Sequence, residues 1–148
     1  MKHKFLILTA ALACLLSCNK TPQPDTFPRE SLYLGTVSVD YEDDVFNNEN
    51  ITVAFDPSED GRTADIIIYK IKFVPKMPVR IDVTIPDVEL RQTPEGLRFS
   101  CDDIAPLALG GEYPKYQVYD LQGTLSGKNL SFSLLFGSYP TRFSGVQQ

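Results

Sequence analysis

Apolar and polar residues alternate along most of the chain between residues 33 and 136. A period of two is typical of β-strands that bury one face, because successive side chains point to opposite sides of the sheet. We find no convincing helical pattern of ten residues or more, so we expect an all-β chain. The alternation predicts eight short strands, at 33–41, 51–55, 66–73, 79–85, 88–91, 97–101, 119–125 and 130–136.

The connections between these predicted strands are mostly turns. Thr93–Gly96 and Ser126–Asn129 have the composition of tight hairpin turns. The acidic stretch Asp56–Gly61 also favours a hairpin over a calcium loop, because Ile67 stands where such a loop needs its last carboxylate. Eight strands joined in this way predict an antiparallel up-and-down β-barrel, since closure pairs every strand edge. A β-sandwich is the alternative.

Two sets of strand residues bear on binding. The alternation places Ile66 and Ile68 on the outer face, where adjoining exposed apolar side chains can mark a contact surface. It places six aromatic side chains on the inner face, where they either fill the core or line a pocket for an apolar ligand. These six are Tyr69, Phe73, Phe99, Tyr119, Phe132 and Phe136.

The longest irregular connection runs from Asp102 to Lys115. It carries Ile104, Leu107 and Leu109 among prolines and glycines. Long loops in compact domains often act as lids or binding elements. We expect these three residues to form a lid or plug at one end of the barrel, with the plug favoured because apolar side chains are more often buried than left open for a ligand.

The start of the chain has a different pattern, which is that of an export signal. Lys2 and Lys4 precede an apolar run from Phe5 to Leu16, which is too short to span a membrane. The run ends in Leu15-Leu16-Ser17-Cys18, which resembles the lipobox of bacterial lipoproteins. That resemblance implies that residues 1–17 are a lipoprotein signal peptide and that Cys18 becomes the site of lipid attachment.

Three parts of the chain follow from this interpretation. After the signal, residues 18–30 hold the lipidated cysteine and a tether with three prolines and little apolar material. Residues 31–148 form a single domain, large enough to bury about 65% of its unfolded surface.

Cleavage before Cys18 changes the chemistry that the chain can support. The only histidine, His3, leaves with the signal, so triads and dyads that need an imidazole, and zinc sites built on histidine, are excluded. The chain after cleavage has 12 basic and 19 acidic residues, and this acidic excess argues against nucleic acid as a partner. Cys101 shares an alternate face with Leu97 and Phe99 and is predicted to be a buried, inert thiol. We expect no cofactor, no metal and no catalytic residue, so the protein is not expected to be an enzyme.

Three segments resemble the calycin-like (lipocalin-like) β-barrel lipoproteins of the Bacteroidetes. They are Tyr33–Val37, Leu121–Leu130 and the ending Phe143-Ser144-Gly145. The resemblance implies an eight-stranded antiparallel barrel in an exported, lipid-anchored protein. The wider lipocalins carry a Gly-x-Trp motif near the first strand. This chain has no tryptophan and therefore lacks that motif.

The sequence therefore predicts a cell-envelope lipoprotein whose barrel binds or carries a small apolar ligand. The alternative is a non-catalytic interaction or structural module with a packed barrel, whose partner is an envelope protein or a protease that it inhibits. The lipid on Cys18 implies attachment to the outer membrane. Asn19–Thr21 lack an acidic run, which favours the periplasmic face over the cell surface.

Overall fold

The computed structural model describes residues 30–148, so the signal, Cys18 and most of the predicted tether lie outside the described residues. Strands make up most of this region, and a single turn of 3₁₀-helix, η1, spans Pro114–Tyr116. The strands are β1 (Ser31–Tyr41), β2 (Asp44–Pro57), β3 (Thr63–Ile71), β4 (Ile81–Thr93), β5 (Gly96–Cys101), β6 (Leu107–Ala108), β7 (Gly111–Glu112), β8 (Val118–Ser126), β9 (Asn129–Phe136) and β10 (Tyr139–Gln147).

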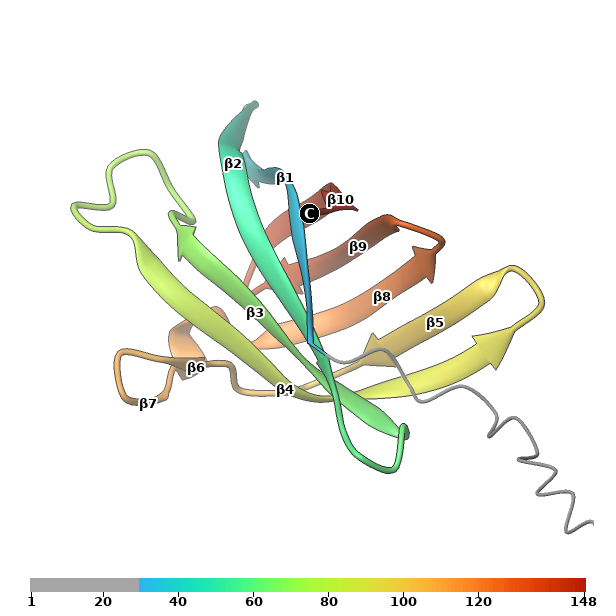
Figure 1. The fold of residues 1–148 in the computed structure, drawn as a ribbon. Helices are drawn as coiled ribbons and strands as arrows, with labels where there is room; N and C mark the ends of the chain where they lie inside the picture. Colours follow the sequence, from blue (N-terminus) through green and yellow to red (C-terminus); the bar gives the residue numbers. More distant parts are fainter. Residues whose placement is uncertain (1–29) are drawn as a thin grey trace, which may run out of the picture.

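Eight of these strands close into one antiparallel barrel (Figure 1). Going around it, β1, β2, β3, β4, β5, β8, β9 and β10 each pair with the next, and β10 pairs back to β1. The small β6–β7 hairpin joins the outside of this circuit through the pairing of Leu107 with Thr84. The all-β, eight-stranded up-and-down barrel is confirmed, in a form consistent with the calycin-like fold, and a sandwich is not formed.

Several strand boundaries differ from the prediction: β2 begins at Asp44 rather than at residue 51, and β3 covers 63–71 rather than 66–73. Two further differences change which segments form the barrel strands. Residues 79–85 and 88–91 do not form two strands; residues 81–93 form the single strand β4, which bulges at Asp87 (φ +53°). The last barrel strand, β10, was missed because its inward positions include Thr141 and Gly145, which weaken the apolar alternation. The Asp56–Gly61 stretch takes part in a hairpin: Asp56 and Pro57 end β2, and residues 58–62 connect it to β3, with Gly61 at φ +67°.

Irregular residues also shift the inward phase of two strands. Ile66 and Ile68 are fully buried, so their predicted outward orientation was wrong and they are not a contact surface. Tyr69 points outward because it alternates with the buried Ile66 and Ile68. The inward phase changes only after Tyr69, where Lys70 adopts φ +57° and the pairing with β4 shifts, so that Ile71 turns inward.

Strand β8 contains a similar irregularity. Tyr119, predicted to point inward, is 38% exposed. The next residue, Asp120, has φ +48°, and the pairing with β9 shifts between Tyr119 and Gln122. Beyond this irregularity Leu121 is buried, whereas Tyr119 lies outside the core.

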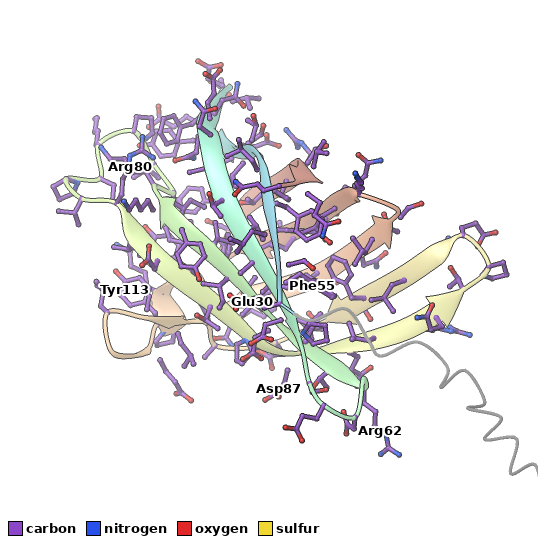
Figure 2. All side chains as sticks on the ribbon, viewed as in Figure 1. Glu30, Phe55, Arg62, Arg80, Asp87 and Tyr113 are labelled. Atoms are coloured by element: carbon purple, nitrogen blue, oxygen red, sulfur yellow. The ribbon has the colours of Figure 1, made fainter. Side chains whose placement is uncertain are left out.

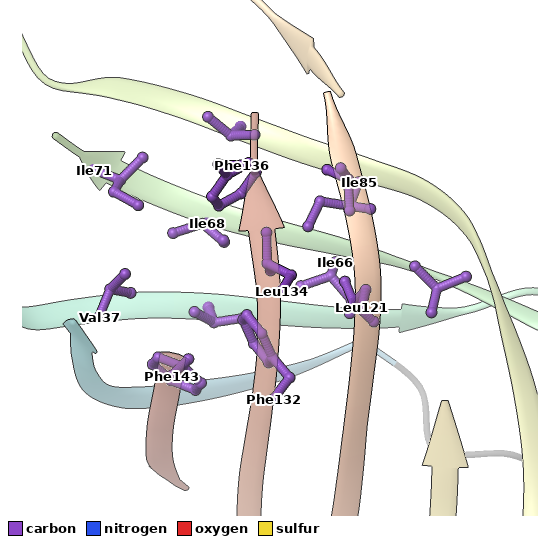
Figure 3. Close-up of a cluster of buried hydrophobic side chains, with 14 of the residues drawn as sticks. Val37, Ile66, Ile68, Ile71, Ile85, Leu121, Phe132, Leu134, Phe136 and Phe143 are labelled. Atoms are coloured by element: carbon purple, nitrogen blue, oxygen red, sulfur yellow. The ribbon is translucent and has the colours of Figure 1, made fainter. Parts of the chain in front are cut away.

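The core is one continuous cluster inside the barrel. Strands β2 and β3 run across the direction of β8 and β9 in Figure 1, and the second half of β4 lies alongside β5. The buried apolar side chains of these strands belong to one cluster. Figure 3 shows Ile66, Ile68 and Ile85 directed toward Leu121 and Leu134 of the opposite strands. Every barrel strand contributes a buried apolar residue, which explains why the alternation ran along nearly the whole chain.

Candidate functional site

The barrel interior is filled by aromatic side chains. Phe99 lies 5.3 Å from Phe55 and 6.3 Å from Phe132 between ring centroids, and Phe132 stacks on Phe143 at 5.1 Å. Of the six predicted inward aromatics, Phe73, Phe99, Phe132 and Phe136 are buried at the inner face, whereas Tyr69 and Tyr119 lie on the outside. The inner four contact one another or other core rings, so they fill the space in which an apolar ligand would lie.

One end of the barrel is closed by a tyrosine that the sequence did not single out. Tyr116 in η1 is 5% exposed and stacks on Phe73 with 3.8 Å between ring centroids. Tyr113 also stacks on Tyr116, with 5.5 Å between ring centroids, and the Tyr139 ring lies 6.2 Å away. Phe136 packs edge-on against Phe73 at 4.8 Å. The long connection therefore does plug the barrel, through aromatic rings.

The three aliphatic residues predicted to form that lid or plug lie elsewhere. Ile104 pairs with Val118 through backbone hydrogen bonds at the edge of the barrel. Leu107 and Leu109 are 41% and 72% exposed, so their predicted plug position was wrong. Leu107 and Ala108 face opposite sides of β6, so that Ala108 is buried and Leu107 is exposed. Leu109 lies in the turn between β6 and β7, with φ +53°.

A groove of about 790 Å³ lies on the outer face of the barrel, across β4, β5, β8, β9, β10 and β1. Its surface is formed by outward residues of two adjoining rows. One row runs through Arg98, Thr124, Ser131, Ser144 and Thr36, and the other through Ser100, Gln122, Ser133, Arg142 and Ser38. Most of these side chains are short and hydroxylated, so the face is hollow. Its exposed surface combines hydroxyl groups with a larger share of carbon atoms, and Phe99, Phe132 and Phe143 also border it.

Glycine and phenylalanine form the layer beneath this groove. Phe99, Gly123, Phe132 and Phe143 are consecutive partners in the inner row. A Cβ atom on Gly123 would lie 2.2 Å from the Phe99 ring, so glycine is required for that ring to lie across β8. The same strands therefore hold the aromatic core on one side and the polar groove on the other.

The charges of the groove are unevenly neutralised. Arg142 donates two hydrogen bonds to the Asp40 carboxylate, at 2.8 and 3.2 Å, and this contact lowers the pKa of Asp40. Arg91 and Arg98 lie directly opposite each other on β4 and β5. Within residues 30–148 neither guanidinium has a hydrogen bond or an ion pair. The Thr93–Gly96 hairpin could have predicted this pair, because its register sets residue 91 against residue 98.

A second cleft, of about 420 Å³, lies beside Cys101 and has several acidic residues at its surface: Asp87, Glu89, Asp102 and Asp120. The Asp102 carboxylate accepts a hydrogen bond from the backbone N–H of Asp120 and so stabilises the bulge of β8. In the part of the chain that the structure describes, no three acidic or cysteine side chains converge as a metal-ligand set.

The Cys101 thiol is expected to react slowly in the folded protein. Burial, assisted by the nearby Asp102 and Glu89 carboxylates, raises the pKa of Cys101 to about 12. Because an unfolded thiol has a pKa of about 8.5, we consider a chain bearing Cys14→Ser and Cys18→Ser, in which Cys101 is the remaining cysteine. Its alkylation by iodoacetamide at pH 8.5 should be about a thousandfold slower when folded than in denaturant. Equal rates would contradict this prediction.

The same shift makes stability depend on pH. The folded Cys101 thiol binds its proton more tightly than the unfolded thiol does. The contribution of the protonated thiol to the free energy of unfolding is therefore fully present below about pH 8.5. Stability is then lost as the pH rises toward the folded pKa of about 12. Urea melts should therefore show a steeper loss above pH 8.5 for this chain than for its Cys101→Ala variant.

Within residues 30–148 no helix is long and apolar enough to cross a membrane. Comparisons of the chain with protein-family models, with curated proteins and with solved structures found no match. The described fold is therefore shown by the strand pairing itself, and the lipoprotein assignment rests on the sequence around Cys18.

Proposed function

We propose that this protein is a non-catalytic interaction module of the cell envelope, anchored by lipid on Cys18, that binds its partner on the outer groove. The observation that carries the proposal is the contrast between the two faces of one sheet. The inner face holds rings that contact one another, whereas the outer face holds a hollow of about 790 Å³ with polar side chains. A site for recognition is therefore available on the outside.

Carriage of a small apolar ligand has less support in this geometry. Such sites are usually concave and mostly apolar, with a volume of about 300 to 1,000 Å³. The groove has a suitable volume and more apolar than polar exposed surface, but eleven of its fifteen bordering residues are Ser, Thr, Gln or Arg. Inside the barrel, Tyr116 covers one end and Phe99 and Phe132 occupy the centre. An apolar molecule would have to displace several buried rings.

Site-specific photocrosslinking in the cells that make the protein tests the proposal. A photoreactive amino acid replaces Ser131 in the groove, and a matched variant carries it at Arg62, on the tip of the β2–β3 hairpin (Figure 2). We expect a crosslinked product from position 131 and none from position 62. Equal products, or none from the groove, would contradict the proposal. Stoichiometric binding of a fluorescent fatty acid by the unmodified protein would favour carriage instead.

A further inference from the structure

The unpartnered arginines suggest what the groove recognises. We propose that it binds a polysaccharide bearing sulfate or phosphate esters, with Arg91 and Arg98 contacting the ester oxyanion. This inference rests on the groove being the binding surface proposed above. The two sources of oxyanion share one chemistry, namely a tetrahedral anionic group attached to a chain rich in hydroxyls.

The arginine pair is costly to the fold in the absence of an anion. Arg91 and Arg98 are exposed cross-strand partners, and like charges directly opposite each other destabilise a sheet. The nearest acidic residue on β4, Glu89, is paired with Ser100 two register positions away and forms no ion pair with either arginine. An oxyanion between the two guanidinium groups would remove this repulsion and accept paired hydrogen bonds from their planar donors.

The arginine on the opposite side of the groove, unlike Arg91 and Arg98, is paired with an acidic residue. Arg142 also borders the groove, but its guanidinium is engaged by both oxygens of Asp40. Its charge is thus already balanced within the protein. The available positive charge is concentrated at the β4–β5 side, which places the anionic group of a ligand beside Arg91 and Arg98.

The floor of the groove fits a polyol better than a peptide. Ser131, Ser133, Ser144 and Thr124 present hydroxyls, and Gln122 presents an amide, all of which can donate to and accept from sugar hydroxyls. Thr124 and Ser131 already lie within hydrogen-bonding distance of each other, at 3.2 Å. Peptides usually bind by adding a strand to a sheet edge or by inserting apolar anchors. Here the strands are paired on both sides, and the phenylalanines that border the groove, Phe99, Phe132 and Phe143, are only 2% to 4% exposed.

The net negative charge of the chain opposes the binding of a polyanion. Binding of a charged dextran would therefore indicate a local site rather than general attraction. The chain carries a net charge of −5, so a polyanion is repelled unless a local site attracts it. Binding of the full chain bearing Cys18→Ser can be followed by affinity electrophoresis in gels that contain dextran sulfate, dextran phosphate or neutral dextran. We expect retardation by at least one charged dextran and little by the neutral one. The preferred charged polymer identifies the ester.

Two double variants then locate the site. Arg91→Gln with Arg98→Gln should weaken binding of the retarding polymer by about tenfold or more, because two charge-assisted contacts are lost. Arg62→Gln with Lys76→Gln removes the same charge from exposed positions outside the groove and should leave affinity nearly unchanged. Thermal melts should show that the first variant is folded and no less stable than the parent, because its like-charge pair is gone.

Three results would overturn the inference: no retardation by either charged dextran, equal retardation by neutral dextran, or equal weakening by the two double variants. Failure here is distinguishable from failure of the proposed function. If charged dextrans do not bind while the residue at position 131 still forms a crosslinked product, the groove is a binding surface for a different partner. If position 131 forms no product, the proposed function itself is contradicted.

Discussion

Replacing Gly35 with alanine is expected to lower the free energy of unfolding by about 3 kcal/mol or more, toward the upper end of what overpacking usually costs. A Cβ atom at this position would lie 2.0 Å from the carbonyl oxygen of Ser144 and 2.6 Å from the Cα of Gly145. Both are backbone atoms of β10, the strand that pairs with β1. The clash cannot be relieved by rotating a side chain, so the two strands must separate.

The close approach lies beside an irregularity in the pairing of β1 with β2. Gly35 pairs with Gly145 on one side and Ile51 on the other, and the β1–β2 register shifts immediately afterwards, before Val37. Gly145 is itself confined, because a Cβ there would lie 2.4 Å from the Phe143 ring. Two facing glycines thus allow β1 and β10 to cross closely and close the barrel.

Urea denaturation followed by circular dichroism measures this effect. Gly111→Ala is the matched control, because a Cβ at Gly111 has no neighbour within 4 Å, and its φ does not lie in the left-handed region. We expect the control to retain nearly the full stability of the parent. If Gly35→Ala and Gly111→Ala denature at the same urea concentration, then β1 and β10 do not approach as closely as described.

Tyr116→Ala should cost about 3 to 5 kcal/mol, the range found when a large buried aromatic side chain is truncated. The ring is 5% exposed and is stacked between Phe73 and Tyr113. Its removal leaves a cavity at the closed end of the barrel and exposes Phe73. Tyr116→Phe should retain most of the stability, since the stacked ring remains.

Tyr119→Ala provides the comparison for this second substitution. Tyr119 is three residues away in the chain but 38% exposed, so its loss should change the midpoint of thermal unfolding much less. The folded fraction of Tyr116→Ala is also expected to bind an environment-sensitive apolar dye that the parent does not bind. Equal thermal midpoints for Tyr116→Ala and Tyr119→Ala would show that the ring does not close the barrel.

The predicted and observed barrels agree in class and strand number, for a reason that involves two compensating differences. The alternation divided β4 at Pro86–Asp87 and passed over β10, so the count of eight came from a different set of strands. Periodicity detects a strand through its apolar positions. It therefore divides a strand at a bulge, and it overlooks one whose inward residues include threonine and glycine, as at Thr141 and Gly145.

The candidate site was less accessible to sequence reasoning. The interior phenylalanines were found because they follow the alternation, but Tyr69 and Tyr119 were assigned to the wrong face because single residues with positive φ shift the phase nearby. The outer groove was missed because short hydroxylated residues produce no conspicuous pattern along any one strand. Only the pairing of β5, β8, β9, β10 and β1 places them on one surface.

By itself, the sequence determined that this chain is all-β and that its apolar residues lie mainly on one side of each strand. These properties are local, since alternation and turn composition act between neighbours in the chain. The tertiary structure decided which rings fill the barrel, that Tyr116 closes it, and that Arg91 and Arg98 adjoin a polar groove. Those outcomes depend on register and on bulges, where one residue of shift transfers a side chain from the core to the solvent.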